Sequence, residues 1–298
     1  MKRHSPKKLW TTLSDIQTTI SVDDGTFSDF LELPVQRFRQ LRNTKKAPSV
    51  CAIDSIAEKL NLDIEHMLGG NIDFTALSEH FFGNDAYVPD KYLVAAHSRR
   101  RTSAQILAYI GRFHGQSSKT ALLRRFQIHE TAFTDLNKTI NINFLSDLCA
   151  TIETMGFSKS EIEKMGAYSF VQNRNTELGH ILSSHKSLRS LHEDIFASTV
   201  GKYFDTNFHY KLIELTDEHC VFESIENRDI CDELGMPHIG TKTTCAIKRG
   251  TTASLAKYLG HNNSKVQETH CIHHGDRSCR FLVSFRPLFG HRPQYLIQ

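Results

Sequence analysis

Apolar positions in the first 170 residues recur at spacings of three and four, the period of an amphipathic helix, and almost no stretch alternates as a strand would. The pattern predicts short helices at about 7–20, 26–32, 34–43 and 50–60, with Pro34 suited to the first helical position. Residues 71–98 lack strong periodicity and are expected to connect two helical regions. The first half of the chain is therefore predicted to be all-α.

The same apolar pattern occurs twice. When the chain is shifted by 95 positions, Phe38 and Leu41 fall on the identical residues Phe133 and Leu136, and the apolar register continues on both sides. Such self-similarity predicts two related copies, with chance resemblance between helical segments as the alternative. The expected domains are 1–75 and 102–170, joined by a linker at 76–101.

Each copy has the layout of a five-helix bundle, and in the first copy a tight turn at Glu32-Leu33 separates two helices. This arrangement resembles the phage-repressor class of helix-turn-helix domains, more clearly in 5–70 than in 102–168. The resemblance implies that the helix after the turn enters the major groove of double-stranded DNA. It also implies a homodimer that pairs two half-sites, unless the two copies in one chain replace dimerisation.

The outward face of the helix at 34–43 favours DNA contact. Phe38 and Leu41 should face the bundle, which leaves Arg, Gln and Asn side chains outward, and these types pair with guanine and adenine edges. No acidic residue occurs from Pro34 to Val50. A solvated helix with a chance excess of arginine is the alternative. The candidate DNA-binding residues are Gln36, Arg37, Arg39, Gln40, Arg42, Asn43, Lys45 and Lys46, the two lysines being placed for phosphates.

The second copy differs in charge. Its corresponding helix, HETAFTDLNKT, carries Glu130 and Asp135 outward, and both would repel phosphate. This copy is expected to bind DNA weakly or to serve in packing and dimerisation. The preceding arginines, 99–101, are expected to form a solvated linker, with a DNA-backbone contact as the alternative.

After residue 185 the spacing of apolar residues changes, and strand-like stretches follow one more helical segment. A helix is expected at 188–204, followed by HYKLIEL and HCVFESI, which predict a hairpin. Residues 243–248 are expected to form a strand that leads into a helix closed by Gly260. KVQETHCI and SCRFLVSF then predict a second hairpin, with Gly275 in its turn. The predicted architecture is therefore multidomain: two all-α helix-turn-helix bundles followed by a small α/β (α+β) sensor domain at 185–298.

Three of the seven cysteines favour a metal site. The predicted hairpin brings Cys271 and Cys279 together, and Cys245 can supply a third thiolate to a structural zinc ion. Strand alternation puts His273 on the same face as Cys271, so His273 is the predicted fourth ligand unless a bulge re-aims Glu268. Cys220 and Cys231 remain further candidates for the fourth position. Buried free thiols, a redox pair and a catalytic cysteine are the alternatives.

These cysteines belong to a longer pattern: Cys245, Gly250, Glu268-x-x-Cys271, Gly275-Asp276 and Cys279-x-Phe281. Together they resemble the 4-vinyl-reductase domain family, over roughly 185–286. That family occurs in bacterial regulators of aromatic catabolism and in tetrapyrrole metabolism. The resemblance implies a small sensor domain with a ligand pocket and a zinc ion held by cysteines at these places, and it does not imply a reaction.

Composition narrows the function classes. The 298 residues are 39% hydrophobic and 23% charged, as in globular proteins, and the net charge of +3 does not by itself indicate a nucleic-acid partner. No apolar run is long enough for a membrane span, and no signal-like stretch follows the basic start, so a cytoplasmic protein is expected. In a reducing compartment an odd number of cysteines favours metal ligation or buried thiols over disulfides.

The sequence therefore predicts a ligand-responsive DNA-binding transcription regulator, not an enzyme, whose C-terminal domain senses a small apolar molecule. One alternative is an enzyme acting on a tetrapyrrole-like or apolar substrate, but neither a nucleotide-binding glycine motif nor a nucleophile motif is present. The other is a haem-based gas or redox sensor, for which 17 histidines are weak support without a haem-attachment motif.

Overall fold

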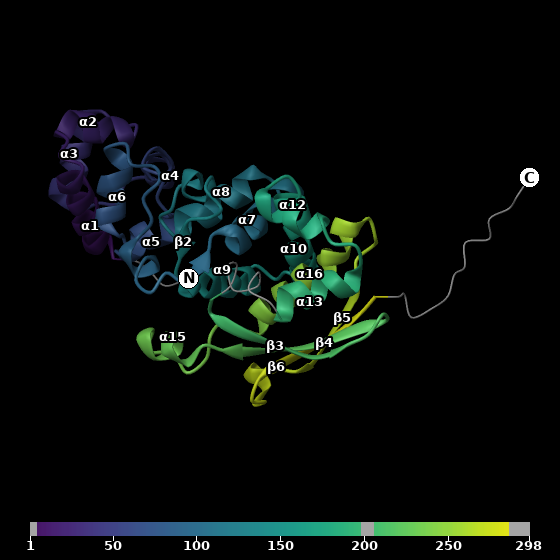
Figure 1. The fold of residues 1–298 in the computed structure, drawn as a ribbon. Coiled ribbons are helices and arrows are strands. Elements are labelled where there is room, and N and C mark those ends of the chain that lie inside the picture. The colour runs from purple at the N-terminus through teal and green to yellow at the C-terminus, as the bar shows by residue number, and fades with distance from the viewer. Residues whose placement is uncertain (1–4, 198–205, 286–298) are drawn as a thin grey trace, which may run out of the picture. The chain divides into compact units, whose positions relative to one another are not determined.

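The computed structural model describes residues 5–197 and 206–285 (Figure 1). It is helix-rich with small antiparallel sheets, which agrees in outline with the predicted α+β multidomain protein. Two compact units are present: Met1–Lys91 with His114–Asp135, and Tyr92–Phe113 with Leu136–Gln298. None of the described helices combines the length and apolar character that a membrane span requires.

The first unit is all helical. Its successive helices are α1 (Pro6–Thr19), α2 (Asp24–Phe30), α3 (Val35–Thr44), α4 (Val50–Lys59), α5 (Ile64–Gly69), α6 (Phe74–Phe81) and, later in the chain, α8 (Gln116–Arg125). Asp23, Ser49 and Asp63 cap α2, α4 and α5 by accepting a hydrogen bond from a backbone N–H in the first turn. The predicted apolar positions form one core, built around Trp10, Ile16, Phe27, Phe38 and Ile56.

The turn between α2 and α3 occurs where the sequence predicts it. Glu32 has a left-handed backbone, with φ of 52°. Phe38 and Leu41 of α3 are buried, and the Phe38 ring packs against Trp10 and Phe27 at centroid distances of 5.8 and 5.7 Å. The helix α3 therefore points its Arg, Gln and Asn face away from the core of its unit.

The internal repeat is visible in the backbone. The left-handed residues Glu32 and Asn61 have counterparts at Gln127 and Gly156, which the shift of 95 positions aligns with them and which also have positive φ. The helix bounds follow the same shift: α7 (Arg101–Phe113), α8, α9 (Ile142–Thr154) and α10 (Lys159–Ala167) correspond to α1, α2, α4 and α5.

The second copy departs from the prediction at one helix. In place of a counterpart of α3, the chain forms a short 3-10 helix, η2 (Glu130–Phe133), and then a strand, β2 (Thr139–Ile140), paired with β1 (Ser98–Arg99). There the His129 ring accepts a hydrogen bond from the Thr131 backbone N–H, and the Thr134 hydroxyl donates to the Thr131 carbonyl, in competition with a helix. The predicted domain at 102–170 is also divided, because α8 and η2 belong to the first unit and α7, α9 and α10 to the second.

The second unit contains a four-stranded antiparallel sheet in the order β3 (Phe208–Leu215), β4 (His219–Glu226), β6 (Cys279–Ser284), β5 (Lys265–His270). Alternate residues of β4 and β6, among them Phe222, Phe281 and Val283, are buried on one face. The helices α13 (Leu188–Ala197) and α16 (Lys242–Ser254) cover that face (Figure 1). Both predicted hairpins are confirmed, and Gly275 in the second has φ of 96°.

The remaining elements are short. They are α11 (Ser169–Asn173), α12 (Glu177–Ser183), α15 (Arg228–Glu233), η1 (Asp90–Tyr92), η3 (Leu255–Leu259) and η4 (Ile272–His274). The helix expected at 188–204 begins as α13, and its second part lies outside the described residues.

The strand expected at 243–248 is wrong, because these residues form the first turns of α16. Thr241 begins the helix with a capping box that involves Thr244. Residues 243–247 are all buried, and a short apolar run of this kind does not distinguish a strand from a buried helix.

Two glycines fix the place of α16. A Cβ atom at Gly250 would lie 1.9 Å from the backbone oxygen of Glu163 on α10, and one at Gly166 would lie 2.1 Å from the oxygen of Ile247. The two helices therefore cross backbone to backbone, at a separation that any side chain would prevent. This crossing holds the helix that carries Cys245.

Candidate metal centre and ligand cavity

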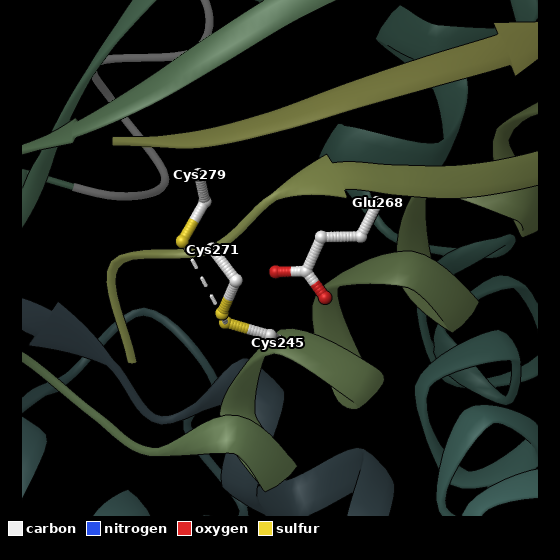
Figure 2. A group of neighbouring side chains, drawn as sticks. All are labelled: Cys245, Glu268, Cys271 and Cys279. Atoms are coloured by element: carbon white, nitrogen blue, oxygen red, sulfur yellow. Dashed lines mark hydrogen bonds between the residues drawn. The ribbon is translucent and has the colours of Figure 1, made fainter. Parts of the chain in front are cut away.

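Four side chains of the second unit converge on one point (Figure 2). They are Cys245 from α16, Glu268 from β5, Cys271 after β5, and Cys279 at the start of β6. One ligand atom from each lies within 4.8 Å of the others, and all three cysteines are buried. The structure thus brings together the three cysteines that the sequence singles out.

The sulfur spacing is that of a metal site and not of a disulfide. The Sγ atom of Cys245 lies 3.8 Å from the Sγ atoms of both Cys271 and Cys279. A disulfide requires about 2.05 Å between sulfurs. A tetrahedral zinc ion with bonds of about 2.3 Å places its sulfur ligands about 3.8 Å apart. Both sulfur pairs that include Cys245 therefore have the spacing of a zinc ion's coordination shell, and all three sulfurs lie within 4.8 Å of one another.

Glu268 supplies the fourth ligand atom. One carboxylate oxygen accepts a hydrogen bond from the Arg249 guanidinium, while Oε1 is buried and has no hydrogen-bond partner among the described residues. A buried polar atom without a partner is rare in folded proteins, and a metal ion would satisfy it. Arg249 also donates to Glu163 at 2.9 Å, so the carboxylate of Glu268 is held in place from outside the cluster.

The predicted fourth ligand, His273, is not in the cluster. A bulge between Glu268 and His270 re-aims the glutamate, and η4 interrupts the alternation that would have placed His273 beside Cys271. The His273 ring instead stands edge-on to His238, at a centroid distance of 6.2 Å. Cys220 and Cys231 are buried elsewhere and contribute nothing to the group.

The thiols differ in acidity. A hydrogen bond donated by Cys245 holds the pKa of Cys279 below its ordinary value, and the backbone N–H of Ile272 adds to this effect at 3.5 Å. The same bond, together with burial, raises the pKa of Cys245. Cys279 is therefore the thiol that most readily becomes the thiolate a metal requires.

Beside α16 lies a partly open cavity of about 210 Å³, lined by residues of the second unit. Most of its lining is apolar, with the rings of Phe196, Phe208 and Phe222 among the larger groups. Its polar lining includes Arg99 and Lys248, whereas none of the described residues around it is an aspartate, glutamate or histidine. The cavity is thus apolar with a positive wall.

Lys248 lies one helical turn after Cys245 and faces this cavity. Its ammonium group donates a hydrogen bond to the Ser224 hydroxyl at 2.7 Å. It also lies 3.5 Å from the ring centroid of Phe208 and 5.4 Å from that of Tyr210. The helix α16 therefore supplies a ligand of the candidate metal centre and a charged wall of the cavity.

In the first unit, the face of α3 is exposed, but not all of its charges are free. Gln36, Arg37, Gln40, Asn43, Lys45 and Lys46 are exposed. Arg37 donates to Gln40 at 2.6 Å, which aligns the two side chains. Arg39 and Arg42 instead bind Asp24 of α2, at 2.8 and 2.7 Å. These two arginines tie α3 to α2, a role that the sequence pattern does not reveal.

The charges of the second copy have structural partners. Glu130 pairs with Lys119 at 2.7 Å. The solvated linker expected at 99–101 is wrong for two of its three arginines, since Arg100 and Arg101 are buried. Arg101 donates to Asn173 at 2.7 Å and to Asn137 at 2.5 Å. Those two arginines stabilise the second unit.

No protein-family model matches the chain, and no curated protein matches its sequence. Among solved structures, the chain is similar to an H-NOX protein from S. oneidensis in the Fe(II)NO ligation state, with 13% identity and a TM-score of 0.47 over 63% of this chain and 99% of that one. A triple-substituted variant in the Fe(II) state gives 12% identity and a TM-score of 0.49, over 63% and 96%. Likenesses of this strength carry no functional conclusion, so function is inferred from this chain's own residues.

Proposed function

We propose that the chain is a ligand-responsive regulator whose second unit binds a small molecule and whose first unit binds DNA. The observation that carries this proposal is that a single helix, α16, lines a mostly apolar cavity and also carries Cys245 of the four-residue cluster. Apolar cavities with a few directed polar groups are the usual form of small-molecule sites.

The cluster would hold a structural zinc ion through Cys245, Glu268, Cys271 and Cys279. Four protein ligands complete a tetrahedral shell and leave no open position for a substrate, as in structural rather than catalytic zinc sites. The ion would tie α16 to β5 and β6, and thereby fix one wall of the cavity. This arrangement supports a non-catalytic role.

DNA recognition is assigned to the exposed face of α3, in accord with its helix-turn-helix setting. Selection of duplexes from a random pool by the full chain should enrich one sequence. Arg37→Ala or Gln40→Ala should weaken binding to that duplex by roughly 1–3 kcal/mol each, because each would remove a base contact. Gel-shift titration measures the change.

Lys138→Glu is the matched control and should change affinity less, because it alters charge in the second copy, outside α3. A pool that yields no enriched sequence would contradict DNA recognition. Wild-type affinity in both α3 variants would contradict the role given to α3. The predicted homodimer stays a prediction, which light scattering of the protein with its selected duplex can test.

A haem-based gas or redox sensor is the second candidate, which the abundance of histidines in the sequence leaves open. The residues present do not fit haem. The cavity of about 210 Å³ is below the usual range of drug-sized pockets, about 300–1,000 Å³, and no histidine, cysteine or methionine occurs among its described lining residues. His192 has a buried Nε2 without a hydrogen-bond partner, but its ring packs between Phe196 and Phe285 and does not line the cavity.

Haem added to the purified protein should therefore not bind at one equivalent. The absorbance spectrum checks this, because haem held by an axial histidine gives a sharp Soret band that free haem lacks. A stoichiometric Soret band that His192→Ala abolishes would establish the haem candidate in place of the cavity ligand.

A further inference from the structure

We propose that the cavity of the second unit takes a small one-ring carboxylic acid, with Lys248 binding the carboxylate. This inference rests on the proposed function, because it names the class of molecule that the cavity would sense. Three features of the described residues support it: the charge of the wall, the partners of Lys248, and the size of the space.

The wall of the cavity carries charge of one sign. Arg99 and Lys248 both line it, and the described lining residues include no aspartate or glutamate. A charge beside an apolar space is costly unless it is paired. A neutral apolar ligand would leave the ammonium of Lys248 facing apolar atoms, whereas a carboxylate would pair with it. The charge pattern therefore favours an anionic ligand over a neutral or cationic one.

Lys248 is available for such a ligand. Its ammonium contacts the Ser224 hydroxyl and the rings of Phe208 and Tyr210, and no carboxylate of the described residues pairs with it, although its charge also favours ionisation of the nearby Cys245 and Cys279 thiols by lowering their pKa values. The next residue shows the contrast, since Arg249 is paired with both Glu163 and Glu268. The neutral contacts hold the ammonium at the wall without neutralising it, which is the state that suits a charge-assisted hydrogen bond.

The size of the cavity limits the apolar part of the ligand. An engineered apolar cavity of about 150 Å³ in another protein binds benzene. The cavity here, about 210 Å³, holds a ring of that kind with one small substituent. Aromatic side chains surround the space, with the rings of Phe196 and Phe222 stacked at a centroid distance of 3.7 Å. A benzoate-sized molecule matches both the volume and the charge.

Calorimetric titration of the metal-loaded full chain with benzoate, toluene and benzylamine tests the assignment. Benzoate should bind at one equivalent, about tenfold or more tighter than toluene, because a hydrogen bond to a charged group is worth about 1.5–3 kcal/mol. Benzylamine, which has the same ring and the opposite charge, should bind most weakly.

Lys248→Met should lower benzoate affinity by about tenfold or more and leave toluene affinity within about threefold, since it removes the charge and keeps the length of the side chain. Lys248→Arg should retain binding of benzoate. Lys257→Met is the matched control: Lys257 is also half-buried near an aromatic ring, 5.9 Å from that of Phe170, but it does not line the cavity. Metal content and a thermal melt show whether each variant is folded.

Two kinds of result would overturn the assignment, and they differ in whether the proposed sensing function also fails. If toluene binds as tightly as benzoate, or if folded Lys248→Met and Lys248→Arg both bind benzoate like the wild type, the ligand class is wrong while the cavity remains a ligand site. If the metal-loaded protein binds none of the three probes, the ligand class and the proposed sensing function both fail.

Discussion

Replacing Cys271 by serine is expected to remove the metal from the second unit and to lower its free energy of unfolding by on the order of 5 kcal/mol. Structural zinc contributes about 10–16 kcal/mol of apparent binding free energy in zinc-finger peptides, and much of it is folding free energy. Serine keeps the approximate size of the side chain but removes one of the three sulfur ligands. The Sγ atom of Cys271 lies 3.8 Å from that of Cys245, as does the Sγ atom of Cys279. Elemental analysis beside a thermal melt measures both effects.

Cys220→Ser provides the matched control, because Cys220 is equally buried in the same core but lies outside the metal cluster. This variant should keep one zinc per chain. Its free energy of unfolding should fall only by the cost of burying a hydroxyl, about 1–3 kcal/mol. The first unit has its own core and should melt unchanged in both variants. Wild-type protein without stoichiometric zinc, or a Cys271→Ser variant that melts normally, would show that the thiols are core residues only.

Gly250→Ala is expected to destabilise the second unit by about 3 kcal/mol, the upper part of the range for an overpacked core. The added methyl group would lie 1.9 Å from the backbone oxygen of Glu163, and neither helix can yield by rotating a side chain. The crossing of α10 and α16 would have to open, which would move Cys245 and Lys248 with it. Denaturant unfolding measures the loss, and zinc affinity should fall together with stability.

Gly25→Ala is the matched control, because it makes the same change at a helical glycine that has room for a methyl group. A Cβ atom at Gly25, in α2, would meet only the Asp23 side chain at 3.4 Å. Alanine there should be neutral or slightly stabilising, since glycine is disfavoured in helices by about 0.5–1 kcal/mol. If Gly250→Ala were as harmless as Gly25→Ala, the two helices would not be in backbone contact.

Local patterns were sufficient to predict much of the first unit. The spacing of Phe38 and Leu41 gives the buried face of α3, and the tight turn predicted at Glu32-Leu33 occurs where expected. The same reasoning fails at η2, where the apolar register of the repeat continues although the side chains of His129 and Thr134 bond the backbone locally. Apolar spacing says which residues face a core, but not whether the backbone between them completes a helix.

At the candidate metal centre, the sequence indicated three residues and missed the fourth. Cys245, Cys271 and Cys279 are the residues that spacing and residue type single out, whereas strand alternation favoured His273 over Glu268. A bulge of one residue reverses that choice, and bulges leave little trace in a single sequence. Glu268, three residues before Cys271, was the alternative fourth ligand on condition of such a bulge.

The family resemblance implied a ligand pocket, but the residues that line the cavity could not be predicted from the sequence. Its lining comes from stretches far apart in the chain, from Ser98 to Tyr258, and no local pattern joins them. Lys248 lies in a stretch, 243–248, that was expected to be a strand and is part of α16. Only the fold shows that this lysine shares a space with Arg99 and the aromatic side chains of β3 and β4.

The single turn of α16 between Cys245 and Lys248 has a thermodynamic consequence. If occupancy of the cavity shifts the balance between two positions of this helix, the affinity of the cluster for its ion changes by some factor. Linkage then requires the ion to change the affinity of the cavity for its ligand by the same factor. Under that condition, the availability of zinc would shift the concentration of small molecule at which the protein responds.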